Sequence, residues 1–552
     1  MRRPSLPRVR TTAVMTLAML ASACGSARMS APQAPGYPAE AKAAMFEAAP
    51  SAPAQAAAIA ADQAQTASPR FNTEQYAEIV ENPFLDSARN PLSTFSIDVD
   101  TASYSNVRRF LTDGSLPPRG AVRIEELINY FHYEYPQPVD GAPFSVTTEV
   151  AACPWQPEHQ LMRVGLQGKT LPQDAIPPRN LVFLVDVSGS MNDPRKLPLL
   201  KSAFRMLVDQ LRPEDHVAIA VYAGASGLAL PPTSGADKQQ ILGALDSLEA
   251  GGSTNGAEGI ELAYRTARTQ FRNGGVNRVI LATDGDFNVG TTSQDALVQL
   301  IERERQSGVF LTVLGFGTGN TKDSTMEMLA DKGNGNYAYI DTIGEARKVL
   351  VEQAGATLVT IAKDVKIQVE FNPNYVRSYR LIGYENRILR AEDFNDDRKD
   401  AGEIGAGHSV TALYELVPNG VASPAGDVDP LKYQAGAAPT NAAGTDELLT
   451  IKLRYKAPDA DDSRLLSTVV RKSDVRLDGG SADLRFASSV AAFGMILRGS
   501  EHKGTATYAL ARQLAERGLG GDPQGHRREF LTLVDAAARL DNKQPGAVQV
   551  AR

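Results

Sequence analysis

Three short segments carry oxygen-bearing side chains of the kind that hold a hard cation. Asp186, Ser188 and Ser190 stand at alternate positions in one segment, while Thr254 and Asp284 lie in two later ones. Mg²⁺ prefers an octahedral array of hard oxygens and usually retains several waters. We therefore predict a divalent-cation site with hydroxyl ligands from Ser188, Ser190 and Thr254, and with Asp186 and Asp284 holding coordinated waters.

The charge of this predicted site indicates what it would bind. If the innermost protein ligands are neutral hydroxyls, a bound Mg²⁺ (or Mn²⁺) keeps most of its positive charge. An incoming Glu or Asp side chain from a protein partner can then supply the missing anionic ligand. The residues do not distinguish Mg²⁺ from Mn²⁺, and they do not identify the partner.

The surrounding sequence predicts the elements that bring these segments together. From Arg179 onward, apolar runs typical of buried strands alternate with amphipathic helical stretches, which predicts a doubly wound, mainly parallel α/β sheet. The predicted strands are 181–186, 217–222, 276–283, 309–316 and 336–340. The predicted helices are 196–211, 239–248, 257–270, 295–306, 325–331 and 345–353. We expect all three cation segments to lie at the carboxyl ends of strands in this sheet, which is where ligands bind in parallel sheets.

These residues resemble a known family. Asp-x-Ser-x-Ser at 186–190, a distant Thr and a distant Asp are similar to the metal-ion-dependent adhesion site of von Willebrand factor A domains, and all five positions match. The flanking Asp-Val-Ser-Gly-Ser-Met and Ala-Thr-Asp-Gly are also typical. The resemblance implies a VWA/Rossmann-like fold, a Mg²⁺ or Mn²⁺ cofactor, and protein binding rather than enzymatic activity. Residues 96–104 and 380–387 extend the resemblance to a bacterial lipoprotein-type subfamily with conserved extensions on both sides, from about residue 83.

The flanks of the metal domain have a different pattern. Residues 144–150 and 160–166, and the stretches 365–371, 379–382, 409–416 and 448–455, alternate with period two like antiparallel strands. Helical periodicity is clearest at 104–111, 122–131, 490–497, 505–516 and 528–540. We predict a β-sandwich-like accessory domain, built from both flanks, into which the metal domain is inserted, with a C-terminal helical cap. Such an insertion would let a pull on the closing helix, 345–353, alter the metal loops, whereas a rigid spacer is the simpler interpretation.

The first residues resemble an export signal. A basic segment, an apolar run of eight residues (13–20) and Ala21-Ser22-Ala23 precede Cys24, as in a secretory signal. The cysteine after small residues is similar to the lipobox of bacterial lipoproteins, although Ala21 stands where Leu is usual. We expect Cys24 to be lipidated, and the protein to be exported and anchored in the cell envelope, in the outer membrane of a Gram-negative bacterium.

The predicted organisation has five parts. They are a signal peptide (1–23), a lipidated cysteine with a disordered Ala/Pro/Gln-rich tether (24–82), an N-terminal accessory domain (83–177), the VWA domain (178–356) and a C-terminal accessory domain (357–552). The length of 552 residues suits several cores. A formal net charge of −7 argues against a nucleic-acid partner.

Other functions remain as alternatives. The six histidines show no zinc-ligand spacing, and no Gly-x-Ser-x-Gly segment occurs. The glycine-rich stretch 315–319 could be a nucleotide loop, but it lacks the third glycine and a Lys-Ser/Thr pair, so a strand-end turn is favoured. The alternatives to metal-bridged binding are a metal-dependent envelope enzyme, and a scaffold whose accessory domains bind while the metal is only structural.

Several single residues have two interpretations. Cys153 and Trp155 are most simply core residues, although Cys153 could form an intermolecular disulfide. Asp98 and Asp100 could be metal ligands, but a structural or capping role is favoured over that. Asp286 and Asn288 could tune the metal site or cap a turn, and the turn is favoured.

Overall fold

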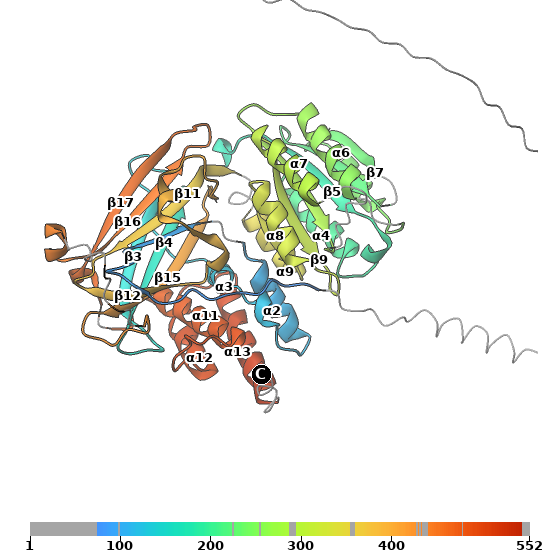
Figure 1. The fold of residues 1–552 in the computed structure, drawn as a ribbon. Coiled ribbons are helices and arrows are strands. Elements are labelled where there is room, and N and C mark those ends of the chain that lie inside the picture. Colours follow the sequence, from blue (N-terminus) through green and yellow to red (C-terminus); the bar gives the residue numbers. More distant parts are fainter. Residues whose placement is uncertain are drawn as a thin grey trace, which may run out of the picture. The chain divides into compact units, whose positions relative to one another are not determined.

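The computed structural model describes residues 74–97, 100–223, 226–252, 256–285, 294–353, 359–426, 429, 432, 440–476 and 478–543 (Figure 1). Within these ranges, no helix is long and apolar enough to cross a membrane. Cys24 and the predicted tether up to residue 73 lie outside them.

The centre of the sequence forms a six-stranded sheet with the order β10-β9-β8-β5-β6-β7. Its strands are β5 (Arg179–Asp186), β6 (His216–Tyr222), β7 (Ser226–Ser234), β8 (Val276–Thr283), β9 (Phe310–Phe316) and β10 (Tyr337–Ile340). All neighbouring pairs are parallel except β6 with the edge strand β7. The predicted doubly wound, mainly parallel sheet is therefore confirmed.

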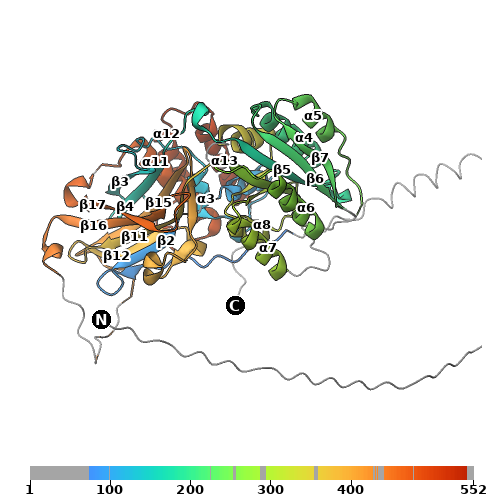
Figure 2. The same ribbon diagram turned by 90° about the horizontal axis from the view of Figure 1, so that it is seen from above.

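Helices cover both faces of this sheet (Figures 1 and 2). They are α4 (Leu197–Asp209), α5 (Lys238–Asp246), α6 (Gly256–Thr269), α7 (Gln294–Gln306), α8 (Asp323–Lys332) and α9 (Ile343–Arg347). One hydrophobic cluster joins α4, α5 and α9 to the sheet, and another joins α6, α7 and α8 to its opposite face. Because β5 and β8 are buried at every residue, each contains an unbroken apolar run, at 181–185 and 279–282, instead of an alternating pattern.

Two antiparallel sheets form the sandwich. One has the order β1-β12-β15-β4-β3, and the other β13-β2-β11-β16-β17, with β14 paired to β11. The strands before the central domain are β1 (Leu85–Asp86), β2 (Leu92–Ser96), β3 (Phe144–Ala152) and β4 (Gln160–Gly168). Those after it are β11 (Thr360–Phe371), β12 (Val376–Ile382), β13 (Ile388–Leu389), β14 (Gly402–Gly405), β15 (Ser409–Pro418), β16 (Glu447–Lys456) and β17 (Ser463–Arg471). Each sheet draws strands from both flanks, as the insertion prediction requires.

The chain enters and leaves the central domain at one place. Ile176, before β5, and Val359, before β11, belong to the same small hydrophobic cluster as Val276, the first residue of β8. This junction therefore lies at the amino ends of the parallel strands. The loops that carry the predicted cation ligands lie at the opposite, carboxyl ends.

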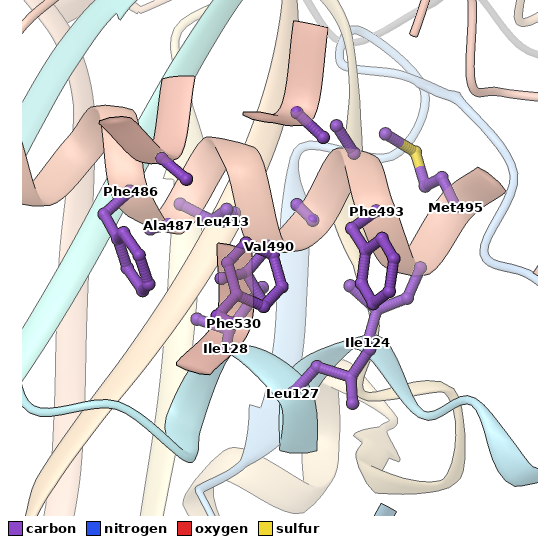
Figure 3. Packing of buried hydrophobic residues seen from close by; sticks show 14 of the residues in the cluster. Ile124, Leu127, Ile128, Leu413, Phe486, Ala487, Val490, Phe493, Met495 and Phe530 are labelled. Carbon is purple, nitrogen blue, oxygen red and sulfur yellow. The ribbon is translucent and has the colours of Figure 1, made fainter. Parts of the chain in front are cut away.

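Helices α11 (Ala482–Arg498), α12 (Tyr508–Arg517) and α13 (His526–Asn542) form the predicted cap. Helix α11 packs on α3 (Ile124–Asn129), where a Cβ at Gly494 would lie 3.0 Å from Ile124 Cγ1. Figure 3 shows Phe486, Val490 and Phe493 of α11 gathered around Phe530 and α3 in this core. The remaining helix of the N-terminal flank, α2 (Ala102–Thr112), contacts α13 and β10.

The structure corrects some predicted elements. Strands β7 and β17 were not predicted, and β14 interrupts a stretch that was predicted to be a plain connection. Most of β17 is exposed, with Leu465 at 57%, so burial imposes no alternation there. The closing helix, predicted as 345–353, is α9 followed by a π-helical segment at Lys348–Glu352.

Candidate metal centre

The candidate site lies where the winding of the central sheet reverses. Strand β5 pairs with β6 on one side and with β8 on the other, and Asp186 is its last residue. Helix α4 follows β5 and helix α7 follows β8, and these two helices cover opposite faces of the sheet. The loops after β5 and β8 therefore meet beside this strand end. The predicted ligands in these loops are therefore close in space.

Asp186 is fully buried and held by three donors. Its Oδ1 accepts the backbone N–H of Ser188 at 2.9 Å, and its Oδ2 accepts the hydroxyls of Tyr222 at 3.2 Å and Thr283 at 3.3 Å. Burial raises the pKa of Asp186 to about 6, although the hydrogen bonds from Ser188 oppose this, and the nearby Asp284 carboxylate adds to the rise. A carboxylate in such surroundings is stabilised by a neighbouring cation.

The two serines of this loop point to one place. Ser188 Oγ and Ser190 Oγ are 3.0 Å apart, with Ser188 buried and Ser190 exposed. The Gly189 N–H donates to Gly252 O at 3.1 Å, which ties this loop to the segment that leads to Thr254. The site thus runs from a buried acid to an exposed hydroxyl, and a ligand can approach it from solvent.

Asp284 follows β8, and its carboxylate is fully buried. Its Oδ2 accepts a hydrogen bond from Lys196 Nζ at 2.7 Å, and Lys196 is only 5% exposed. Lys196 precedes α4 and was not singled out in the sequence. A lysine before an apolar helix is an ordinary surface pattern, so nothing in the sequence signalled that its side chain reaches the site.

The loop of Asp284 is packed against the loop between β9 and α8. A Cβ at Gly285, whose φ is +104°, would lie 2.6 Å from Asn320 O. In turn, Gly319 N–H donates to the carboxylate of Glu74 at 2.8 Å, and Gln75 N–H donates to Thr321 O at 3.0 Å. The start of the described chain therefore lies beside the loop between β9 and α8, a contact that the sequence did not reveal.

Some predicted site residues are not described. Thr254, Asp286 and Asn288 lie outside the described residues, as does Cys24. Among the described residues, no group of three or more His, Cys, Asp or Glu side chains could hold a metal ion. The candidate donors Asp186, Ser188, Ser190 and Asp284 are instead a mixture of carboxylates and hydroxyls. Hard oxygens of this kind fit Mg²⁺ or Mn²⁺.

The alternative sites have structural roles. Asp100 Oδ1 accepts the Tyr337 N–H at 2.7 Å, so Asp100 fixes the start of β10. Cys153 is a buried free cysteine in the core of the cap, and its pKa is raised by burial. In the glycine-rich stretch 315–319, Gly319 N–H already serves a carboxylate, which opposes a phosphate-binding role for that loop.

Family models match nearly the whole described chain. The model for the von Willebrand factor type A domain matches residues 180–353, one described as von Willebrand factor matches residues 70–163, and one described as "Uncharacterized protein YfbK, C-terminal" matches residues 356–540.

Several known proteins match this chain over different lengths. YfbK of Escherichia coli is 44% identical over 493 residues, covering 88% of this chain and 84% of YfbK. The human inter-alpha-trypsin inhibitor heavy chain H4 is 30% identical over 149 residues, covering 25% of this chain and 16% of its own. Among solved structures, a von Willebrand factor type A protein from Catenulispora acidiphila covers 83% of this chain and 91% of its own, at 14% identity and a TM-score of 0.40. On the strength of the identity to YfbK across most of both proteins, the chain belongs to the von Willebrand factor type A domain family, in the group that includes YfbK.

Proposed function

We propose that this chain is a cell-envelope lipoprotein that binds a protein partner through a Mg²⁺-bridged carboxylate at the site formed by Asp186, Ser188, Ser190, Thr254 and Asp284. The observation that carries the proposal is the meeting of buried Asp186 with the paired hydroxyls of Ser188 and Ser190 at the switch point of the sheet. A VWA domain points to a protein-interaction role. The oxygen donors at this site suggest how the interaction would be made, through a metal ion that binds a carboxylate of the partner.

The residues divide the work in a definite way. The serine hydroxyls are neutral, so they would hold a metal without cancelling its charge. Asp186 is fixed by Tyr222 and Thr283 and cannot rotate freely away from the site. When bound, the metal would supply a Lewis-acidic position to which a partner's Glu or Asp side chain adds. The function is binding, with no catalytic residue assigned.

The exported, lipid-anchored location rests on the first 24 residues of the sequence. A basic segment, an apolar run and small residues before Cys24 support it. Diacylation of Cys24 would give stable anchoring, since more than one acyl chain is needed for that. The metal domain would then act at a membrane surface within the envelope.

A capture experiment tests the proposed function. The chain from Gly25 onward is immobilised and offered detergent-solubilised envelope extract with Mg²⁺ or with EDTA, beside Asp186→Ala as control. We expect a partner that is retained only by the wild type with Mg²⁺, and that is lost when its own contacting Glu or Asp is replaced. Equal capture in all conditions would move binding to the accessory domain.

A further inference from the structure

Lys196 brings a positive charge into the candidate metal site. Its Nζ lies 2.7 Å from Asp284 Oδ2, and both side chains are almost completely buried. A buried ammonium is costly unless it is paired, so this placement depends on the carboxylate. Three charged side chains of the described residues therefore lie together here: the carboxylates of Asp186 and Asp284 and the ammonium of Lys196.

The path of the lysine side chain is fixed by the backbone. Its methylene groups lie across Gly317, where a Cβ would be 2.3 Å from Lys196 Cγ and 2.4 Å from Cε. Gly317 has φ +75°, and its carbonyl accepts the hydroxyl of Tyr339. Because Gly317 has no side chain, the loop after β9 leaves room for the Lys196 side chain to reach Asp284.

This arrangement changes the charge of a loaded site. The two carboxylates and one ammonium leave one net negative charge, so a divalent cation would leave one net positive charge. With a neutral residue in place of Lys196, the same cation would be neutralised completely. The ammonium of a lysine here repels the divalent cation and attracts an anion that approaches the bound cation. Both effects are Coulomb interactions, and they are strong because the site is poorly solvated.

We propose that Lys196 is a positioning and specificity residue of the metal site, which weakens the binding of the divalent cation and reserves positive charge for a carboxylate ligand. The proposal deepens the proposed function and rests on it. It differs from a purely structural ion pair, which would hold the two loops together without altering the affinity for metal.

Mn²⁺ alone is the first probe. Free Mn²⁺ is counted by electron paramagnetic resonance during titration of the full mature chain as wild type, Lys196→Met, Lys196→Arg and Asp186→Ala. Lys201→Met is the matched control, because Lys201 lies on α4, the helix that Lys196 precedes, but donates to the backbone oxygens of Asp246 and Leu248. We expect Lys196→Met to bind Mn²⁺ about tenfold more tightly than the wild type, while Lys196→Arg and Lys201→Met resemble the wild type.

Acetate is the second probe. It is added to the Mn²⁺-loaded proteins while water-proton relaxation reports the replacement of metal-bound water. We expect Lys196→Met to need several times more acetate than the wild type for half-saturation, and Lys196→Arg to restore the wild-type value.

The outcomes separate the two proposals. Equal Mn²⁺ and acetate affinities in the wild type and Lys196→Met, with binding lost in Asp186→Ala, would overturn the role of Lys196 and leave the metal site standing. Weaker Mn²⁺ binding by a folded Lys196→Met would also overturn it. An absence of Mn²⁺ binding in the wild type and in Lys196→Met alike would overturn the metal site, and the role of Lys196 with it.

Discussion

At the residue scale, the candidate site joins the hydroxyls of Ser188 and Ser190 to two buried carboxylates, one of which accepts a hydrogen bond from a buried lysine. Asp186, Ser188 and Ser190 lie within five positions, so their spacing alone predicts that they share a loop. Asp284 needed the prediction of a parallel sheet to bring it near. The contact of Lys196 with Asp284 could not be predicted. It depends on the space beside Gly317, and only the folded structure shows that this loop lies next to Lys196.

Asp215 offers a test of electrostatics away from the metal site. Burial alone would raise its pKa, but hydrogen bonds from Arg179 and Arg212 outweigh this and lower the pKa to about 2. A carboxyl whose pKa is lowered in the fold contributes stability above its unfolded pKa and loses that contribution as the pH falls towards its folded pKa.

We therefore expect Asp215→Asn to lower the free energy of unfolding by about 2 kcal/mol at pH 7. The difference from wild type should shrink between pH 5 and pH 3, as urea titrations at several pH values would show. Asp209→Asn, an exposed acid at the end of α4, is the control and should change little. A difference that is constant with pH would contradict the assignment.

At the scale of elements, burial decides which parts the sequence could predict. Strands β5, β8 and β9 are long, buried apolar runs between amphipathic helices, and their predicted bounds agree with the structure within two residues. Strand β7 has Leu228 44% exposed and lies at an edge, so its sequence lacks a clear apolar face. The π-helical segment after α9 could not be predicted either. An α-helical turn and a π-helical turn differ in their hydrogen-bond partners and not in composition.

Glu74 and Gln75 are hydrogen-bonded to the loop after β9. Arg109 Nη2 donates to Glu74 at 2.9 Å, and Glu74 in turn accepts the Gly319 N–H. We expect Glu74→Ala to speed hydrogen exchange at the Gly319 amide at least severalfold, because that amide loses its acceptor. Glu78→Ala, at an exposed position, should leave the exchange unchanged. Unaltered exchange in Glu74→Ala would show that the Gly319 amide does not depend on its hydrogen bond to Glu74.

At the scale of the whole described unit, buried ion pairs join the central domain to the parts that flank it. Arg108, on α2, contacts Asp341 at 2.5 Å and Glu345 at 2.7 Å, and both acids belong to the central domain. Arg123, beside α3, contacts Asp323 of α8 at 2.6 Å. The two parts are therefore held together by buried ion pairs.

Removal of Arg123 should expose this dependence. We expect Arg123→Met to destabilise the protein by about 3 kcal/mol, because it leaves the buried carboxylates of Asp323 and Glu126 without their guanidinium. Calorimetric unfolding is the measurement, and the central domain should begin to unfold separately from the sandwich. Arg390→Met, at an exposed arginine, is the control. Unchanged unfolding in Arg123→Met would mean that the interface does not depend on this pair.

The proposed anchor predicts a specific covalent state. Mature protein isolated from membranes of the producing bacterium should begin at Cys24 and carry acyl chains, which intact-mass spectrometry would detect. The Cys24→Ser variant should lack them and leave the membrane fraction. A wild-type protein with an unmodified Cys24 would contradict the lipoprotein assignment.

The most direct test of the central claim is calorimetric titration of the mature chain with Mg²⁺, beside a Ser188→Ala/Ser190→Ala double variant. Ser202→Ala on α4 is the matched control, because its hydroxyl donates to Pro198 O, away from the site. We expect one Mg²⁺ per chain for the wild type and the control, and a loss of binding in the double variant. Equal Mg²⁺ binding by all three proteins, or none by the wild type, would contradict it.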